Sequence, residues 1–115
     1  MKHIKLVVNN DKIKRGKEEF FIKKELQCIL NLYAKMVSNG SWKDYAFSTG
    51  SREVSFDVYQ RASEKPVIRI TKNLKPKYSN EKFFIKDRNG NVLNKSESLN
   101  YLISKTSWNK LRLIK

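Results

Sequence analysis

The sequence is poor in the residues that build metal centres and disulfide frameworks. It holds one cysteine and one histidine among 115 residues, with only four glycines and two prolines. The lone Cys28 excludes an intrachain disulfide framework and a zinc site built on several cysteines. This cysteine usage is typical of a reducing compartment, so we expect a cytoplasmic protein. With His3 near the start as the only histidine, we expect no catalytic cysteine–histidine pair, no metal site and no cofactor.

Long apolar runs are also missing. The apolar segment near the amino terminus, Ile4–Val8, is interrupted by Lys5 and is too short for a signal-peptide core or a membrane span. We therefore expect no membrane association. Apolar residues still make up 39% of the chain and include 6 Phe, 5 Tyr and 2 Trp, enough for one core. Residues 1–19 are expected to form a flexible basic lead-in, and residues 20–115 a single domain.

Acidic residues are scarce relative to basic ones. The 25 Lys and Arg against 11 Asp and Glu give a net charge of +14, which attracts phosphate polyanions. However, 19 of the 25 are Lys, whereas base recognition and bidentate phosphate contacts favour Arg. Lys, Asn, Ile, Phe and Tyr together supply 50 of the 115 residues, and all have A/T-rich codons. A low-GC genome is thus an alternative explanation for the charge.

The strongest periodic pattern predicts a helix from about Lys23 to Asn39. Its apolar stripe comprises Leu26, Ile29, Leu30, Tyr33, Met36 and Val37. Ile22 offers no side-chain acceptor as an N-cap, and Gly40 supplies the left-handed residue that ends a helix. Cys28 falls on the side opposite the stripe, so we expect it to point to solvent or a partner.

Alternating apolar and polar residues after Gly40 predict antiparallel strands. Trp42 is expected to staple the helix end to the sheet. Gly50-Ser51 fits a two-residue type II′ hairpin, which would place Thr49 opposite Arg52.

The turn at residues 62–66 predicts a second hairpin. Pairing Arg61 with Val67 would place Tyr59 opposite Arg69 and Asp57 opposite Thr71. Ile68 and Ile70 would then face the core, with Asp57 diagonal to Arg69.

The remaining pattern predicts a strand over Lys82–Asp87, a hairpin at Asn89-Gly90 and a short strand at Val92-Leu93 whose register is ambiguous. Leu99, Leu102 and Ile103 form a second helical stripe. The predicted fold is α+β: an antiparallel four- to five-stranded meander with one long N-terminal helix and a shorter C-terminal helix packed on one face.

Three sets of residues are candidates for function. The polar face of the sheet could hold a phosphate or carboxylate, or form only a lattice of cross-strand ion pairs; its members are Asp57, Tyr59, Arg61, Arg69 and Thr71. The second set is the polar turn with Ser63, Glu64 and Pro66, a partner contact or simply hairpin chemistry. The third comprises candidate polyanion contacts: Lys12, Lys14, Arg15, Lys17, Lys75, Lys77 and Lys82.

Linked motifs resemble an alphaproteobacterial family of uncharacterised proteins, domain of unknown function number 2794. The matching residues are Leu32-Tyr33, Met36-Val37, Gly40, Trp42, Asp44-Tyr45-Ala46, Arg61-Ala62-Ser63-Glu64, Pro66 and Arg69-Ile70. The resemblance covers roughly residues 20 to 105. It departs from the family at Ile22 and in the shorter loop at Gly50-Ser51. It implies no activity.

Two functional hypotheses follow. The first is a non-enzymatic binding or adaptor domain whose partner is a protein or an unknown ligand. The second is a nucleic-acid-binding module that uses the basic lead-in, the loop over residues 73–82 and the arginines of the sheet. An enzyme is the least favoured class because the sequence offers no plausible nucleophile–base pair. Edge strands and the Trp108 segment are compatible with a monomer or a homodimer.

Overall fold

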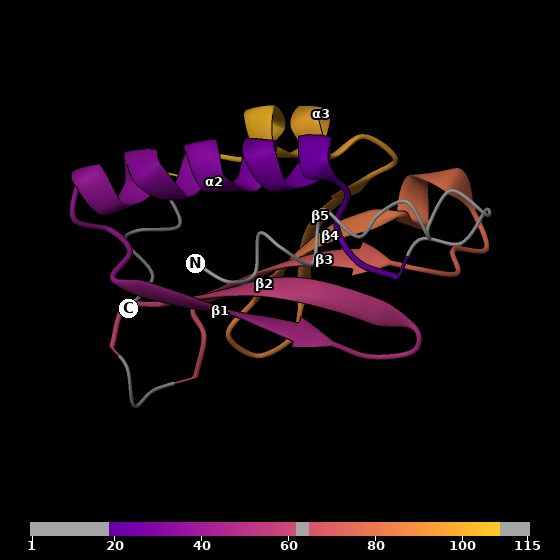
Figure 1. Cartoon of the computed structure of the whole chain (residues 1–115), viewed down its shortest axis with the longest axis horizontal. Coiled ribbons are helices and arrows are strands. Elements are labelled where there is room, and N and C mark those ends of the chain that lie inside the picture. The colour runs from indigo at the N-terminus through magenta and orange to yellow at the C-terminus, as the bar shows by residue number, and fades with distance from the viewer. Residues whose placement is uncertain (1–18, 62–64, 109–115) are drawn as a thin grey trace.

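The fold is a five-stranded antiparallel meander in the order β1-β2-β3-β4-β5, with helices on one face (Figure 1). This computed structural model describes residues 19–61 and 65–108. The elements are α2 (Lys23–Ser38), β1 (Asp44–Thr49), β2 (Glu53–Tyr59), β3 (Ile68–Asn73), the 3-10 turn η2 (Ser79–Glu81), β4 (Phe83–Asp87), β5 (Val92–Ser96) and α3 (Leu99–Lys105). The α+β prediction is confirmed, including the long first helix and the shorter second one.

The buried side of helix α2 is rotated relative to its predicted stripe. Ile29 and Met36 are buried as expected, but Leu32 is buried as well and Val37 is 41% exposed. The buried side turns toward Leu32 because α3 lies beside α2 and covers a second side of it (Figure 1). The helix ends at a Schellman motif: Gly40 has φ +82°, and its N–H and that of the next residue donate to two carbonyls of the last turn.

The first hairpin is longer than predicted. Thr49 pairs with Val54, not with Arg52, so four residues connect the paired positions. The type II′ prediction is wrong, because Gly50 is not among the glycines with positive φ. The carbonyl of Arg52 instead accepts a hydrogen bond at 2.8 Å from the N–H of Leu74, the residue that follows β3. The backbone of Arg52 is therefore bonded toward β3 and does not pair with β1.

The register of the second hairpin is likewise shifted by two residues. Asp57 pairs with Arg69, Ser55 pairs with Thr71, and Phe56 pairs with Ile70. The predictions that Asp57 opposes Thr71 and lies diagonal to Arg69 are therefore wrong. Because both shifts are even, every side chain keeps its predicted face. The core face still carries the fully buried Val54 and Phe56.

The register of the last strands could not be predicted because it is irregular. Ile85 pairs with Asn94, whereas Lys86 pairs with Val92, so the pairing shifts between adjacent residues. Strand β5 also runs to Ser96, beyond the predicted Val92-Leu93.

Aromatic side chains pack together in the core near the C-terminal end of α2. Trp42 is 4% exposed, and its ring lies 6.1 Å from that of Tyr33 and 5.6 Å from that of Trp108. Trp42 therefore packs on α2 and on the segment after α3, and its predicted role as a staple between the helix end and the sheet stays a prediction. In α3, Leu102 is fully buried and Leu99 is 4% exposed, as its stripe indicated.

Candidate functional site

A buried carboxylate lies on the outer face of the sheet, which we define as the face away from α2 and α3. Asp57 is 1% exposed. It accepts hydrogen bonds from the hydroxyls of Ser48 at 2.6 Å and Ser55 at 2.7 Å. Arg69, opposite it on β3, brings its Nε to 3.4 Å from Asp57 Oδ1. Since a desolvated charge needs partners, Asp57 constrains the Arg69 guanidinium, whose side chain stays 45% exposed.

A second cation stands directly beside this arginine. Lys86 on β4 is the register partner of Arg69, so two basic residues oppose each other across neighbouring strands. Like charges in this position are destabilising. The Lys86 Nζ lies 3.6 Å from Glu53 and 5.7 Å from the ring centroid of Phe84. Arg69 and Lys86 thus form a basic row flanked by acidic groups along the outer face.

The basic row leads into a concavity of about 340 Å³ at the end of the sheet, which we call the basic hollow. Its lining residues are Lys65, Pro66, Arg69, Lys86, Asp87, Arg88, Asn89 and Gly90. Four of these are cations and one is an acid, so the lining carries an excess of three positive charges. The hollow forms because the β2–β3 and β4–β5 turns meet at the same end of the meander.

Among the described residues that line the basic hollow, Asp87 is the one acid, and its carboxylate accepts hydrogen bonds from within the β4–β5 hairpin. One of its carboxylate oxygens accepts hydrogen bonds from the backbone N–H groups of Asn89 and Asn91, both at 2.9 Å. Partial desolvation raises the pKa of Asp87, but hydrogen bonds from Asn91, Asn89 and Gly90 outweigh it and hold the pKa below its usual value. The carboxylate therefore stays ionised and braces the loop that carries Arg88.

The predicted members of the polar face are only partly brought together. Asp57 and Arg69 meet. Thr71 is 1% exposed and faces Ser55, and its hydroxyl has no hydrogen-bond partner among the described residues. Tyr59 pairs with Asp44 at the far end of β2, and Arg61 lies exposed beyond the strand.

In each of the other two candidate sets, the structure describes some residues and not others. Pro66 lines the basic hollow. Residues 1–18 of the lead-in, which include Lys12, Lys14, Arg15 and Lys17, lie outside the described residues, as do the turn residues Ser63 and Glu64.

A second basic recess contains two of the predicted polyanion contacts. Lys75 and Lys77 line a concavity of about 580 Å³ with Arg52, at the end of the sheet near the β1–β2 loop. Two acids, Glu53 and Glu81, line the same recess. Glu53 also pairs with Lys86, which lines the basic hollow. Lys82 lies apart, with its Nζ 5.6 Å from the ring of the buried Phe83.

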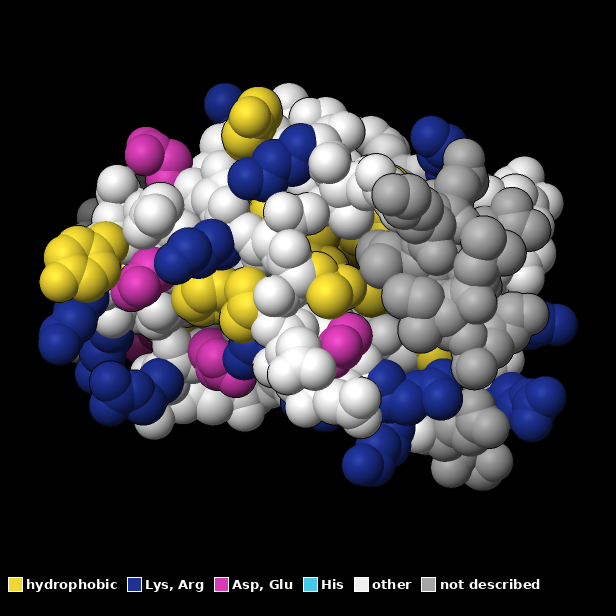
Figure 2. All heavy atoms as spheres, turned by 180° about the vertical axis from the view of Figure 1, so that it is seen from behind, with side chains coloured by type: hydrophobic (Ala, Val, Ile, Leu, Met, Phe, Trp, Pro, Cys, Tyr) yellow, Lys and Arg dark blue, Asp and Glu magenta, His cyan; other side chains and the backbone are white. Residues whose placement is uncertain are grey.

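Figure 2 shows Lys and Arg side chains along the lower rim, the side of the sheet away from the helices, and others over the upper half, with Asp and Glu side chains among them and apolar side chains near the middle. Among the described residues, no group of three or more His, Cys, Asp or Glu could hold a metal ion. None of the described helices is long and apolar enough to cross a membrane.

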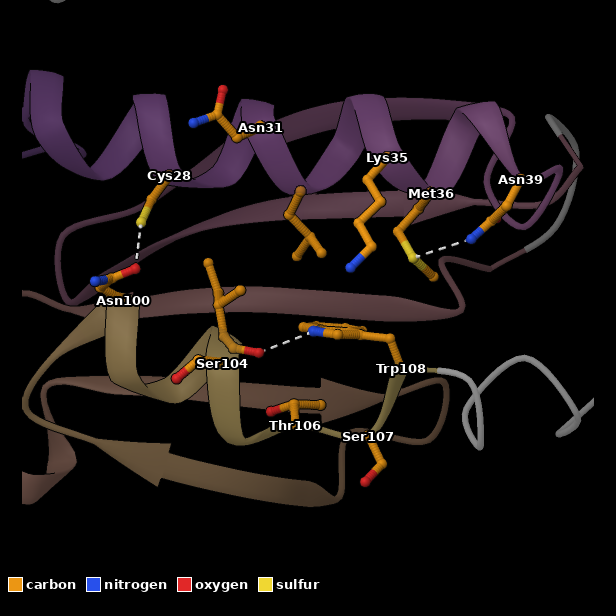
Figure 3. Close-up of a pocket in the computed structure, with 12 residues that line it drawn as sticks. Cys28, Asn31, Lys35, Met36, Asn39, Asn100, Ser104, Thr106, Ser107 and Trp108 are labelled. Atoms are coloured by element: carbon orange, nitrogen blue, oxygen red, sulfur yellow. Dashed lines mark hydrogen bonds between the residues drawn. The ribbon is translucent and has the colours of Figure 1, made fainter.

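A larger groove of about 710 Å³ runs between α2 and α3 (Figure 3). Several polar groups that line this groove form hydrogen bonds with other residues of α2 and α3. The Cys28 thiol donates to Asn100 Oδ1 at 3.4 Å, Asn39 Nδ2 donates to the Met36 sulfur at 3.8 Å, and the Trp108 indole donates to a carbonyl of α3 at 2.9 Å. Cys28 was predicted to point to solvent or a partner; it is instead half-buried and contacts Asn100 of α3, which lies along that side of α2. Burial raises the pKa of its thiol, and the charge of Glu25 raises it further, so the thiol is a poor nucleophile.

Sequence reasoning missed three cations of the basic hollow and one buried ion pair. Lys65, Lys86 and Arg88 belong to turns and strands that only the register brings together. Lys72 is 1% exposed on the core face, where its Nζ lies 2.8 Å from Glu25 Oε1 and 3.0 Å from the carbonyl of Phe20. The one available signal was the inward position of Lys72 in the strand alternation.

Comparison with known proteins gives a family without an assigned activity. No curated protein and no solved structure is significantly similar to the chain. The model of one family, described as a protein of unknown function (DUF2794), matches residues 20–103. The match spans α2, the whole sheet and most of α3, so the chain belongs to the DUF2794 family.

Proposed function

We propose that this domain is a non-enzymatic binding module that takes the phosphate backbone of a nucleic acid along the outer face of its sheet. One observation carries the proposal: Arg69 and Lys86 oppose each other directly on β3 and β4, and Arg69 forms an ion pair with the buried Asp57. A phosphate between two such cations would relieve the repulsion that their register creates.

The surroundings of the basic row support an extended anion over a single small one. The basic hollow adds Lys65 and Arg88 at one end, and the recess with Arg52, Lys75 and Lys77 lies toward the other. Cations thus occur along the length of the face. A chain of phosphates fits such a distribution, and the net charge of +14 draws it in at long range.

The lysine-rich composition offers a competing explanation, which a matched pair of variants separates. Arg69→Gln with Lys86→Gln removes two charges from the basic row. Lys23→Gln with Lys24→Gln removes the same two charges from the exposed start of α2. If charge alone matters, both pairs weaken binding equally. If the row contacts phosphate, the first pair weakens binding much more.

The measurement is fluorescence anisotropy of labelled oligonucleotides against the full chain over a range of salt. We expect binding that persists near 150 mM salt, and a salt dependence of log K that becomes shallower by roughly 1.4 in the Arg69→Gln/Lys86→Gln variant, since each single-strand phosphate contact contributes about 0.7. Binding that vanishes at that salt, or equal losses in the two variants, would refute the proposal and favour the adaptor function with a protein partner.

A further inference from the structure

We propose that the nucleic acid is single-stranded and that its bases stack on Phe84 and Tyr59; this inference rests on the proposed function. Both rings belong to the outer face. Phe84 is two residues before Lys86 on β4, and Tyr59 is two residues after Asp57 on β2, so strand alternation places them beside the basic row. Both side chains are half-buried, which leaves part of each ring exposed.

The two rings lie on opposite sides of the row. In the register, Asp57, Arg69 and Lys86 form one line across β2, β3 and β4. Tyr59 and Phe84 are displaced from that line in opposite directions. Four residues along the strands and two strand spacings across them separate the backbone positions of Tyr59 and Phe84 by about 16 Å. The backbone positions of Arg69 and Lys86 therefore lie between those of the two aromatic residues, an arrangement that suits a nucleic-acid backbone crossing the row with bases on either side.

The chemistry of the face separates a single strand from a duplex. In a duplex the bases are stacked on each other, so an aromatic ring on a sheet has no base face to contact. Proteins that recognise base pairs in duplex DNA commonly insert a helix or a two-stranded β-ribbon into the major groove. Here α2 and α3 pack on the opposite face from the basic row (Figure 1). Aromatic rings with interleaved cations on a sheet are instead typical of single-strand recognition.

Other aromatic residues of the sheet are occupied in the core. Tyr45, Phe47 and Phe56 lie on the inner face, with ring centroids 5.0 to 5.8 Å apart. Phe84 instead has the Lys86 ammonium 5.7 Å from its centroid. This ammonium lies over the partly exposed ring, so an aromatic surface and a phosphate contact lie within one nucleotide's reach.

The test replaces each ring by leucine, which keeps the charge and much of the apolar volume. We expect Phe84→Leu and Tyr59→Leu each to weaken binding of a single-stranded oligonucleotide by at least about five-fold, with the salt dependence unchanged. Tyr101→Leu is the control, because Tyr101 is 58% exposed on α3, on the other side of the sheet. Circular dichroism checks that each variant is folded. We also expect wild type to bind a single strand more tightly than the matching duplex.

The outcomes distinguish this inference from the proposed function. If duplex and single strand bind equally and neither leucine variant weakens binding, while Arg69→Gln/Lys86→Gln does, the stacking inference is overturned and the phosphate-binding module stands. If no oligonucleotide binds near physiological salt, both are overturned. Loss of single-strand affinity in Phe84→Leu and in Tyr59→Leu, but not in Tyr101→Leu, supports the inference.

Discussion

The buried ion pair between Lys72 and Glu25 allows the sharpest test of the fold. The two side chains are 1% and 10% exposed, and their charged atoms lie 2.8 Å apart. Glu25 Oε1 also accepts the N–H of Ile22 at 2.9 Å, at the start of α2. The pair therefore joins the first turn of α2 to the end of β3, across the edge of the core.

Lys72→Met removes the cation and leaves Glu25 as a buried anion. Removing one partner of such a pair costs about 3–5 kcal/mol. At about 4–8 °C per kcal/mol for a domain of this size, the midpoint of thermal unfolding should fall by roughly 12 °C or more. Adding Glu25→Leu removes the stranded charge as well, so the double variant should lie within about 2 kcal/mol of wild type despite losing the acceptor for Ile22.

The assay is urea denaturation of wild type, both single variants and the double variant, followed by circular dichroism. Lys95→Met is the matched control, because Lys95 is exposed on β5 and its loss should change stability by less than about 0.5 kcal/mol. A Lys72→Met effect as small as that of the control, or single-variant effects that simply add in the double variant, would show that the pair does not hold α2 to the sheet.

Two predictions concern titrating groups. The pKa of Asp87 is lowered in the fold, so its charge stabilises the hairpin above the pKa of the unfolded chain, and this stability is lost as pH falls through the folded pKa; Asp87→Asn should destabilise the domain in urea titrations near pH 7 and progressively less as the pH falls through the folded pKa. Because the pKa of Cys28 is raised, alkylation by iodoacetamide near pH 8 should be slower in the folded chain than in urea, and equal rates would contradict the Asn100 contact.

Much of the fold could be predicted because face and register are separate properties of a strand. The alternation around Phe56 and Ile70 assigns faces, and any even shift in register preserves them. The register itself depends on loop length. Gly50-Ser51 satisfies a short hairpin locally, but the pairing of β2 with β3 makes the longer loop the better solution.

The candidate site was less predictable because it is assembled from distant segments. Asp57 and Arg69 were expected on one face, yet their direct contact depends on the two-residue shift. Lys86 becomes significant only when it is placed opposite Arg69, and the hollow requires two turns about 20 residues apart in sequence to meet. The ion pair of Lys72 was missed for a related reason, since its partner Glu25 lies 47 residues away in sequence, on α2.

The most direct test of the binding face is an amide chemical-shift titration of the isotope-labelled chain with a single-stranded oligonucleotide near 150 mM salt. The phosphate-binding module predicts that the largest shift changes occur at β3, β4 and the Asp87–Asn91 turn, around Arg69 and Lys86. Changes concentrated on the α2–α3 groove, or spread evenly over exposed lysines such as Lys23 and Lys24, would contradict it.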